Sequence, residues 1–141
     1  MINIPRRVKN LIRKWGTRDP FKLCEYLGII IIYSDLGAAK GYYEKILRKK
    51  VIVINQNLDE FSMLIVLAHE LGHALLHCSN DLQFLHSYTL LPRTSRLETE
   101  ANKFAAELLL DDEMNFWGYE YNECGLGEKI FKDLIILKTN Y

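Results

Sequence analysis

The chain has 141 residues, 49% of them hydrophobic, and its 18 basic side chains are matched by 18 acidic ones. This length and apolar content suffice for one compact domain with one core. The formal net charge of zero gives the protein no overall field that would attract nucleic acid or an anionic membrane surface. We therefore expect a single domain over residues 1–141 and no direct binding of nucleic acid.

Cysteine usage and hydropathy indicate a protein of the reducing cytoplasm. Cys24, Cys78 and Cys124 are widely spaced and form no CxxC pair, so we expect buried or free thiols. The longest apolar stretches, Leu27–Tyr33 and Met63–Ala68, are much shorter than the ~20 residues that span a bilayer. The N-terminus lacks the uninterrupted apolar run of a signal peptide. The expected localisation is cytoplasmic, without a membrane segment.

Two helices are predicted at the N-terminal end. Apolar residues recur at helical spacing over Ile4–Trp15, and Gly16 is well placed to end this helix. Asp19 is a capping residue directly before a proline, and a short second helix follows that ends at Gly28.

Three β-prone stretches come next. The β-branched run Ile29–Tyr33 predicts a buried strand. Gly41–Leu47 and Lys50–Ile54 are joined by the charged pair at residues 48–49, which predicts a hairpin. The order of elements so far is therefore helix, helix, strand and hairpin.

The longest helical pattern covers Phe61–Leu76, with Asn57 or Asp59 available as the N-cap. The segment Ser79–Arg96 is irregular, since it contains a proline and several polar breaks, and it predicts a loop.

A further helix is expected to begin at Thr94 or Ser95 and to run to about Leu110. Ser95 precedes Glu98 by three residues, which is the spacing of a capping box. Residues 111–126 have no clear pattern, and Gly127–Leu137 predicts a last helix or strand.

The chemistry lies in the long helix, where residues 69–73 read His-Glu-Leu-Gly-His. Two histidines four residues apart lie on one face of a helix, so His69 and His73 can direct ring nitrogens at one metal ion. Zinc held by two histidines and a third protein ligand keeps a position for water, whose pKa it lowers toward neutrality. Glu70 is placed to accept that water's proton and to deliver it to the leaving amine. The motif predicts a zinc peptidase.

A third histidine is not the expected third ligand. The longer HExxHxxGxxH pattern fails because its last position is Ser79. His77 lies eight residues past His69, about 12 Å along the helix axis, which is too far for both to bind one ion. We interpret His77 as a helix-end histidine or a support for a ligand. His86 lies in the irregular segment and could be a ligand only if that segment folds back.

A carboxylate of the next helix is the better candidate. Glu98 fits the capping role and Glu107 falls late in the helix, whereas Glu100 directly precedes the helix's apolar face. Two histidines and one glutamate form a known catalytic zinc set. The predicted metal ligands are therefore His69, His73 and Glu100.

Three segments resemble the ImmA/IrrE family of small metallopeptidases. They read VINQNL at residues 53–58, LAHELGHALLH at residues 67–77 and ETEANKFAAELL at residues 98–109. The resemblance covers about residues 28–110, and the family's third zinc ligand falls on Glu100. It implies an α+β fold, a small zincin-like metallopeptidase domain with a short, antiparallel-containing sheet packed on the active-site helix and a following ligand-bearing helix. The implied parts are N-terminal helices (1–27), a catalytic core (28–110) and a C-terminal segment (111–141).

The resemblance also implies a function. Family members are cytoplasmic regulatory proteases that cleave a helix-turn-helix repressor of a phage or mobile element. Substrates of zincin-like enzymes add a strand to a sheet edge, and Gly41–Leu47 is the candidate edge. Tyr88 is the candidate for stabilising the oxyanion, with His86 and Arg96 as alternatives that no spacing rule ranks. The alternative function is a metal-binding regulator or sensor that binds a partner without proteolysis.

Overall fold

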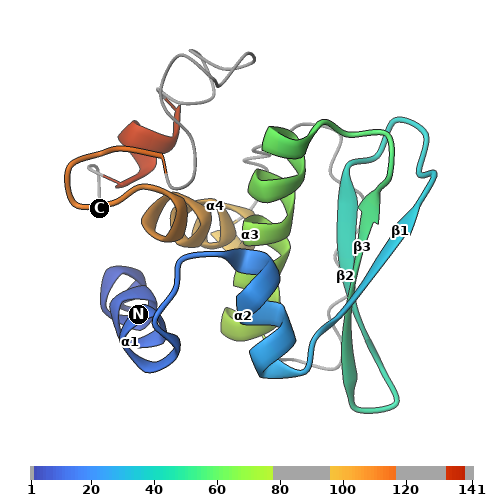
Figure 1. The fold of residues 1–141 in the computed structure, drawn as a ribbon, viewed down its shortest axis with the longest axis horizontal. Helices are drawn as coiled ribbons and strands as arrows, with labels where there is room; N and C mark the ends of the chain where they lie inside the picture. Colours follow the sequence, from blue (N-terminus) through green and yellow to red (C-terminus); the bar gives the residue numbers. More distant parts are fainter. Residues whose placement is uncertain (1, 78–95, 117–132, 139–141) are drawn as a thin grey trace.

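A central helix organises the molecule, with a sheet on one side and a second long helix on the other (Figure 1). The computed structural model describes residues 2–77, 96–116 and 133–138. The elements in chain order are α1 (Ile4–Trp15), α2 (Pro20–Leu27), β1 (Ile30–Ser34), β2 (Gly41–Ile46), β3 (Lys49–Asn55), α3 (Glu60–Leu76) and α4 (Arg96–Leu109). The expected α+β class, with a small mixed sheet packed on the motif-bearing helix α3, is confirmed.

The sheet has the strand order β1-β3-β2, in which β1 is parallel and β2 antiparallel to β3. The predicted hairpin is confirmed, but its turn lies at Leu47 and Arg48, one residue earlier than expected. Both turn residues have positive φ angles, 48° and 70°, as a two-residue type I′ turn requires. This turn type matches the twist of the strands, and it therefore sets the register of the hairpin.

Strand β1 corrects one expectation. The run Ile29–Tyr33 was expected to be a buried strand, but Ile30 is 41% and Ile32 is 45% exposed. These two residues pair with Val51 and Val53, on the sheet face opposite the one that packs on α3. A β-branched run therefore predicted the strand correctly, but not its position at the edge of a sheet with helices against one face.

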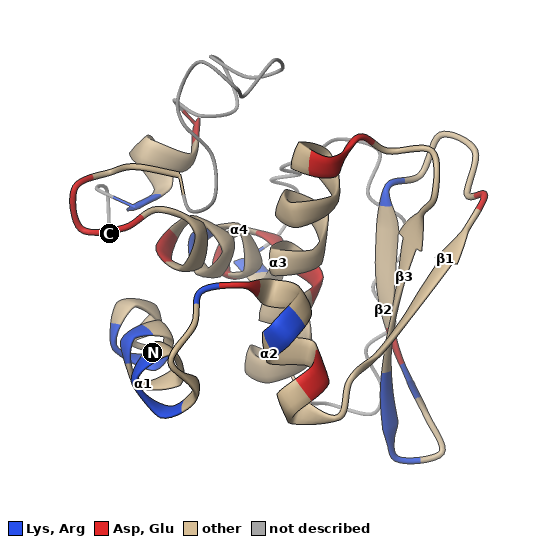
Figure 2. Cartoon of the chain, in the orientation of Figure 1, with Lys and Arg blue, Asp and Glu red and all other residues tan. Residues whose placement is uncertain are grey.

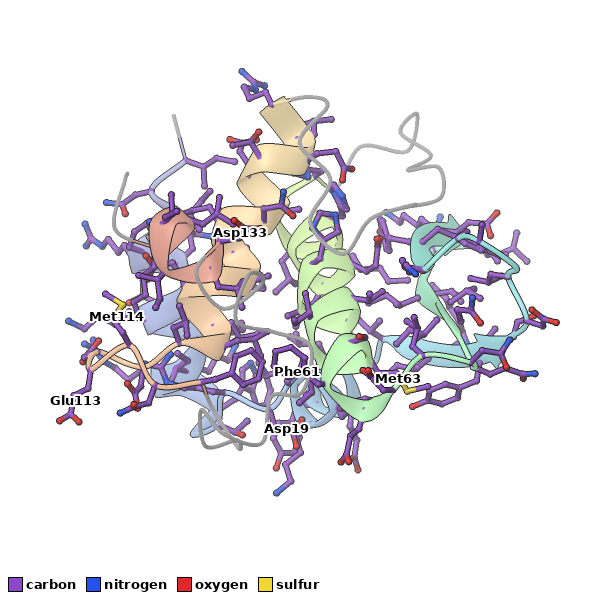
Figure 3. The ribbon with its side chains drawn as sticks, turned by 90° about the horizontal axis from the view of Figure 1, so that it is seen from above. Asp19, Phe61, Met63, Glu113, Met114 and Asp133 are labelled. Carbon is purple, nitrogen blue, oxygen red and sulfur yellow. The ribbon has the colours of Figure 1, made fainter. Side chains whose placement is uncertain are left out.

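Helix α3 is buried on nearly every side from Phe61 to Ala74. It begins at Asp59, one of the two expected caps, whose Oδ1 accepts a hydrogen bond from the Ser62 backbone N–H at 2.7 Å. Figure 3 shows Phe61 on the side of α3 that faces α4 and Met63 on the side that faces the sheet. An all-round apolar helix of this kind belongs in a core, between two layers.

The last carbonyls of α3 are bound by basic side chains from distant elements. Lys50 Nζ donates to the Ala74 carbonyl at 2.8 Å, and an Arg7 Nη donates to the Leu75 carbonyl at 3.2 Å. Arg7 is one of several basic residues on α1 (Figure 2). Cations at a helix C-terminus satisfy its unpaired carbonyls and its dipole. The end of α3 is thereby tied to β3 and α1.

Helix α4 packs closely on α3 at Gly72. A Cβ atom at this position would lie 3.1 Å from Phe104 Cβ, tighter than ordinary contacts. The glycine at position 72 therefore allows the close approach of the two helices. At its far end, Arg18 Nη1 donates to the carbonyls of Glu107 and Leu108 at 3.0 and 3.1 Å. The packing of Phe104 on Gly72 and the hydrogen bonds from Arg18 therefore hold α4 in position against α3.

The N-terminal helices agree with the sequence. Both α1 and α2 end at the expected glycines, Gly16 and Gly28, which adopt left-handed backbone angles with φ of 71° and 72°. Near the C-terminus residues 133–138 are helical, whereas the rest of the expected element at 127–132 lies outside the described residues. No helix within the described ranges has the length and hydropathy to cross a membrane.

Gly41 offers a test of the packing between the sheet and α3. A Cβ atom there would lie 2.8 Å from the Val53 backbone oxygen and 2.8 Å from Val66 Cγ1. We expect Gly41→Ala to lower the free energy of unfolding by roughly 1–3 kcal/mol, because overpacking forces the backbone to shift. Urea denaturation measures this change. Lys45→Ala, at an exposed position of the same strand, is the control, and equal stabilities of the two variants would contradict the packing described.

Cys24 is buried and free, as expected, whereas Cys78 and Cys124 lie outside the described residues. Burial, assisted by the nearby Asp19 carboxylate, raises the pKa of the Cys24 thiol to about 12. Because the thiolate is the reactive form, we expect iodoacetamide at pH 8 to leave Cys24 unmodified in the native protein and to alkylate it in urea. Mass spectrometry of the peptide containing Cys24 measures this, and rapid labelling of the native protein would disprove it.

Candidate functional site

The two histidines of the motif lie side by side on the buried face of α3. His69 and His73 are 2% and 0% exposed, and their ring centroids are 4.8 Å apart. Glu70 lies beside them and is 2% exposed. Donor atoms of these three residues all lie within 4.8 Å of one another. The helix therefore gathers the predicted catalytic group into one buried cluster.

Glu98, from the first turn of α4, reaches both histidines. Its Oε2 accepts a hydrogen bond from His69 Nε2 at 2.9 Å, and its Oε1 lies 2.8 Å from His73 Nε2. The Glu98 side chain is 16% exposed, so it lies at the outer boundary of the cluster. One carboxylate thus bridges two imidazoles that are one helical turn apart.

Glu70 is arranged differently from Glu98. Its Oε1 is 4.0 Å from His69 Nε2, and its buried Oε2 has no hydrogen-bond partner among the described residues. A buried carboxylate oxygen without a partner is unfavourable, so such atoms in proteins usually have a partner or a special role. Glu70 is therefore beside the bridged histidines, with an oxygen that can still accept a proton.

The residues at this site fit a divalent cation. Ligands of one tetrahedral zinc ion at ~2.0–2.1 Å lie roughly 3.3 Å from each other. The two contacts between Glu98 and the histidines, at 2.9 and 2.8 Å, are close to this separation. Imidazole nitrogens and a carboxylate oxygen are also the donors that zinc takes in catalytic sites. A small outward movement of Glu98 would make room for the ion.

The protonation states of Glu98 and His73 agree with cation binding, whereas at His69 the contacts with Glu98 and Glu70 outweigh burial and raise the pKa. Burial opposes ionisation of Glu98, but hydrogen bonds from His69 and His73 outweigh it and lower the Glu98 pKa to about 2. Burial lowers the His73 pKa to about 4 and raises the Glu70 pKa to about 7. Near neutral pH, Glu98 is therefore ionised and His73 is neutral, as metal ligands must be.

Glu100 does not reach the two motif histidines, contrary to the expectation that it completes the ligand set. Its Oε1 accepts a hydrogen bond from His77 Nε2 at 3.0 Å. Residues 98 and 100 differ by about 200° around a helix, so the two side chains leave α4 in different directions. The sequence argument gave Glu98 to a cap with Ser95, which lies outside the described residues, and it thereby chose the other face of α4.

His77 ends α3, as expected for a helix-end histidine. Its Nδ1 lies 3.0 Å from His73 Nδ1, so it contacts this motif histidine at the ring nitrogen that does not face Glu98. Asn102, which the sequence reasoning missed, is fully buried, and after Glu98 and Glu70 it also contributes to the raised pKa of His69. Its position four residues after Glu98 was the available signal, because that spacing places both on one face of α4.

The expected oxyanion residue, Tyr88, lies outside the described residues, as does the alternative His86. The other alternative, Arg96, is the first residue of α4 and is exposed. The assignment of Tyr88 stays a prediction.

Comparisons with known proteins agree with this geometry. A peptidase family model described as "IrrE N-terminal-like domain" matches residues 24–115, which include every residue of the cluster. The "Uncharacterized immunity region protein 2" of Bacillus phage phi105 is 41% identical over 110 residues, which are 77% of this chain and 69% of the relative. "Metallopeptidase ImmA" of Bacillus subtilis (strain 168) is 35% identical over 114 residues, 79% of this chain and 65% of the relative. The chain therefore belongs to the ImmA/IrrE family of metallopeptidases.

Proposed function

We propose that the chain is a zinc-dependent endopeptidase whose metal is held by His69, His73 and Glu98. The observation that carries this proposal is the Glu98 carboxylate, whose oxygens lie 2.9 and 2.8 Å from the Nε2 atoms of both histidines. Two imidazoles and one carboxylate are a catalytic zinc set that leaves a position for water. Glu98 thus takes the place that the sequence argument gave to Glu100.

Glu70 is the proposed general base and acid. Zinc, when bound, would lower the pKa of a water molecule and polarise the carbonyl of the scissile peptide. Glu70 accepts the proton of the attacking water and then donates it to the nitrogen of the leaving amine. Its distance of 4.0 Å from His69 Nε2 supports this role, because it keeps Glu70 beside the ligands. Tyr88 remains the proposed residue for stabilising the oxyanion.

The proposed substrate is a helix-turn-helix transcriptional repressor of a phage or mobile element. Family membership supports a protein substrate, and one relative is named as an immunity region protein of a phage. A repressor acts in the cytoplasm, which is where we place the reaction. The chain spans about two thirds of the two relatives' own lengths, so the substrate is assigned here only as a proposal.

Metal content distinguishes the two candidate carboxylates on α4. We expect Glu98→Ala to lose most of its zinc after dialysis, because the third ligand is gone. Glu100→Ala should keep nearly one zinc per chain when no chelator competes, since this side chain contacts His77. Mass spectrometry of metals in the purified variants measures both, with circular dichroism to verify folding. If Glu98→Ala keeps its zinc and Glu100→Ala loses it, Glu100 is the third ligand, as the sequence analysis predicted.

Cleavage tests the role of Glu70. We expect Glu70→Gln to bind zinc like the parent and to cleave a co-expressed repressor slower by roughly 10²–10⁴-fold, because general acid–base catalysis is lost. Immunoblots of the repressor, followed by assays with purified proteins and a chelator, measure this.

The same experiment separates proteolysis from the alternative function. A regulator that binds without turnover would give no fragment with either the parent or Glu70→Gln, although both bind zinc. Unchanged cleavage by Glu70→Gln would instead refute the mechanism and leave the metal site intact.

A further inference from the structure

We propose that His77 and Glu100 are positioning residues that hold His73 in the orientation and tautomer that bind the metal. The inference rests on the proposed zinc site. It gives a function to two buried side chains that neither bind the metal nor touch the reacting atoms in the scheme above.

The three side chains form one continuous line of contacts from α4 to the metal ligand. Glu100 Oε1 lies 3.0 Å from His77 Nε2, and His77 Nδ1 lies 3.0 Å from His73 Nδ1. The residues are 7%, 6% and 0% exposed, in that order along the line. Because bulk water is excluded, each of these hydrogen bonds is stronger than it would be at the surface.

The direction of the hydrogen bonds follows from the chemistry of the groups. The Glu100 carboxylate oxygen accepts, so His77 donates to it from Nε2. His77 Nδ1 then presents a lone pair, which accepts the proton on His73 Nδ1. With the metal bound, the remaining ring nitrogen of His73, Nε2, therefore carries the lone pair that the ion needs. In the metal-free cluster this is the nitrogen that lies 2.8 Å from Glu98 Oε1.

The backbone holds His77 in place as well. Its N–H donates to the His73 carbonyl at 2.9 Å, and the chain leaves the helix at this residue. The other motif histidine lacks such a line of contacts, because His69 Nδ1 has no hydrogen-bond partner among the described residues. Helix α4 would thus supply one metal ligand, Glu98, and, through Glu100, the support of His73. Such outer partners fix the ring orientation and tautomer of metal-bound histidines.

Zinc affinity tests this inference without reference to proteolysis. Competition with a chromophoric chelator should show zinc binding weaker by roughly 10–100-fold in both His77→Leu and Glu100→Ala. His77→Asn should recover most of the affinity, because its amide oxygen can accept in place of Nδ1. Glu107→Ala is the matched control: it breaks a pair with Lys103 on the same helix, away from the histidines, and should keep the parent's affinity.

A spectroscopic signal separates positioning from a merely structural role. In the zinc-loaded parent labelled with ¹⁵N, we expect the His73 Nδ1 proton to exchange slowly with water. In His77→Leu this proton should exchange fast, and in His77→Asn it should again be protected. If His77→Leu does not fold, Glu100→Ala supplies both measurements.

Two failures are distinguishable. If the parent binds zinc and Glu98→Ala does not, but His77→Leu and Glu100→Ala bind like the parent, the positioning role is refuted and the metal site stands. An unprotected His73 proton in the zinc-loaded parent would also refute that role. If the parent itself binds no zinc, the proposed metal site fails and the inference fails with it.

Discussion

Burial of two imidazoles and a carboxylate within an apolar helix is the constraint on which the rest of the site depends. His69, Glu70 and His73 lie among fully buried neighbours such as Leu67 and Leu71. Burying such groups without partners costs several kcal/mol, so the fold has to provide partners or a cation. Helix α4 provides partners directly through Glu98, which contacts both histidines, and indirectly through Glu100, which contacts His77. The site is therefore a property of the α3–α4 pair and not of the motif alone.

The placement of α4 decides whether those partners reach the histidines. Gly72 of α3 lets Phe104 of α4 approach the backbone of α3 closely. At the C-terminal end of α4, Arg18 donates hydrogen bonds to the carbonyls of Glu107 and Leu108. The Lys103 ammonium is buried as well and binds the Leu137 carbonyl at 2.8 Å. These contacts join α4 to α3, to the segment after α1 and to the C-terminal residues. Contacts far from the histidine motif thereby position the residues of α4 that reach the motif.

Sequence reasoning succeeded where a local pattern carries the information. Helical spacing with glycine caps located α1 and α2, and the four-residue spacing located His69 and His73 on one face. It did not indicate that Glu98 contacts both histidines and Glu100 contacts His77, because periodicity separates the core face of a helix from the solvent face but does not say which flank meets a second helix. It also misjudged Ile30 and Ile32, since β-branched runs are alike in central and edge strands. Both failures concern how elements are placed against each other, which only tertiary packing decides.

The central claim is that α3 and the first turn of α4 share one zinc ion. Anomalous diffraction at the zinc absorption edge, from crystals of the metal-loaded protein, tests this claim most directly. The account predicts one strong peak at about 2.0–2.2 Å from His69 Nε2, His73 Nε2 and a Glu98 oxygen, with Glu70 outside the ligand set. A peak bound by Glu100 in place of Glu98, or no peak between the two histidines, would contradict it.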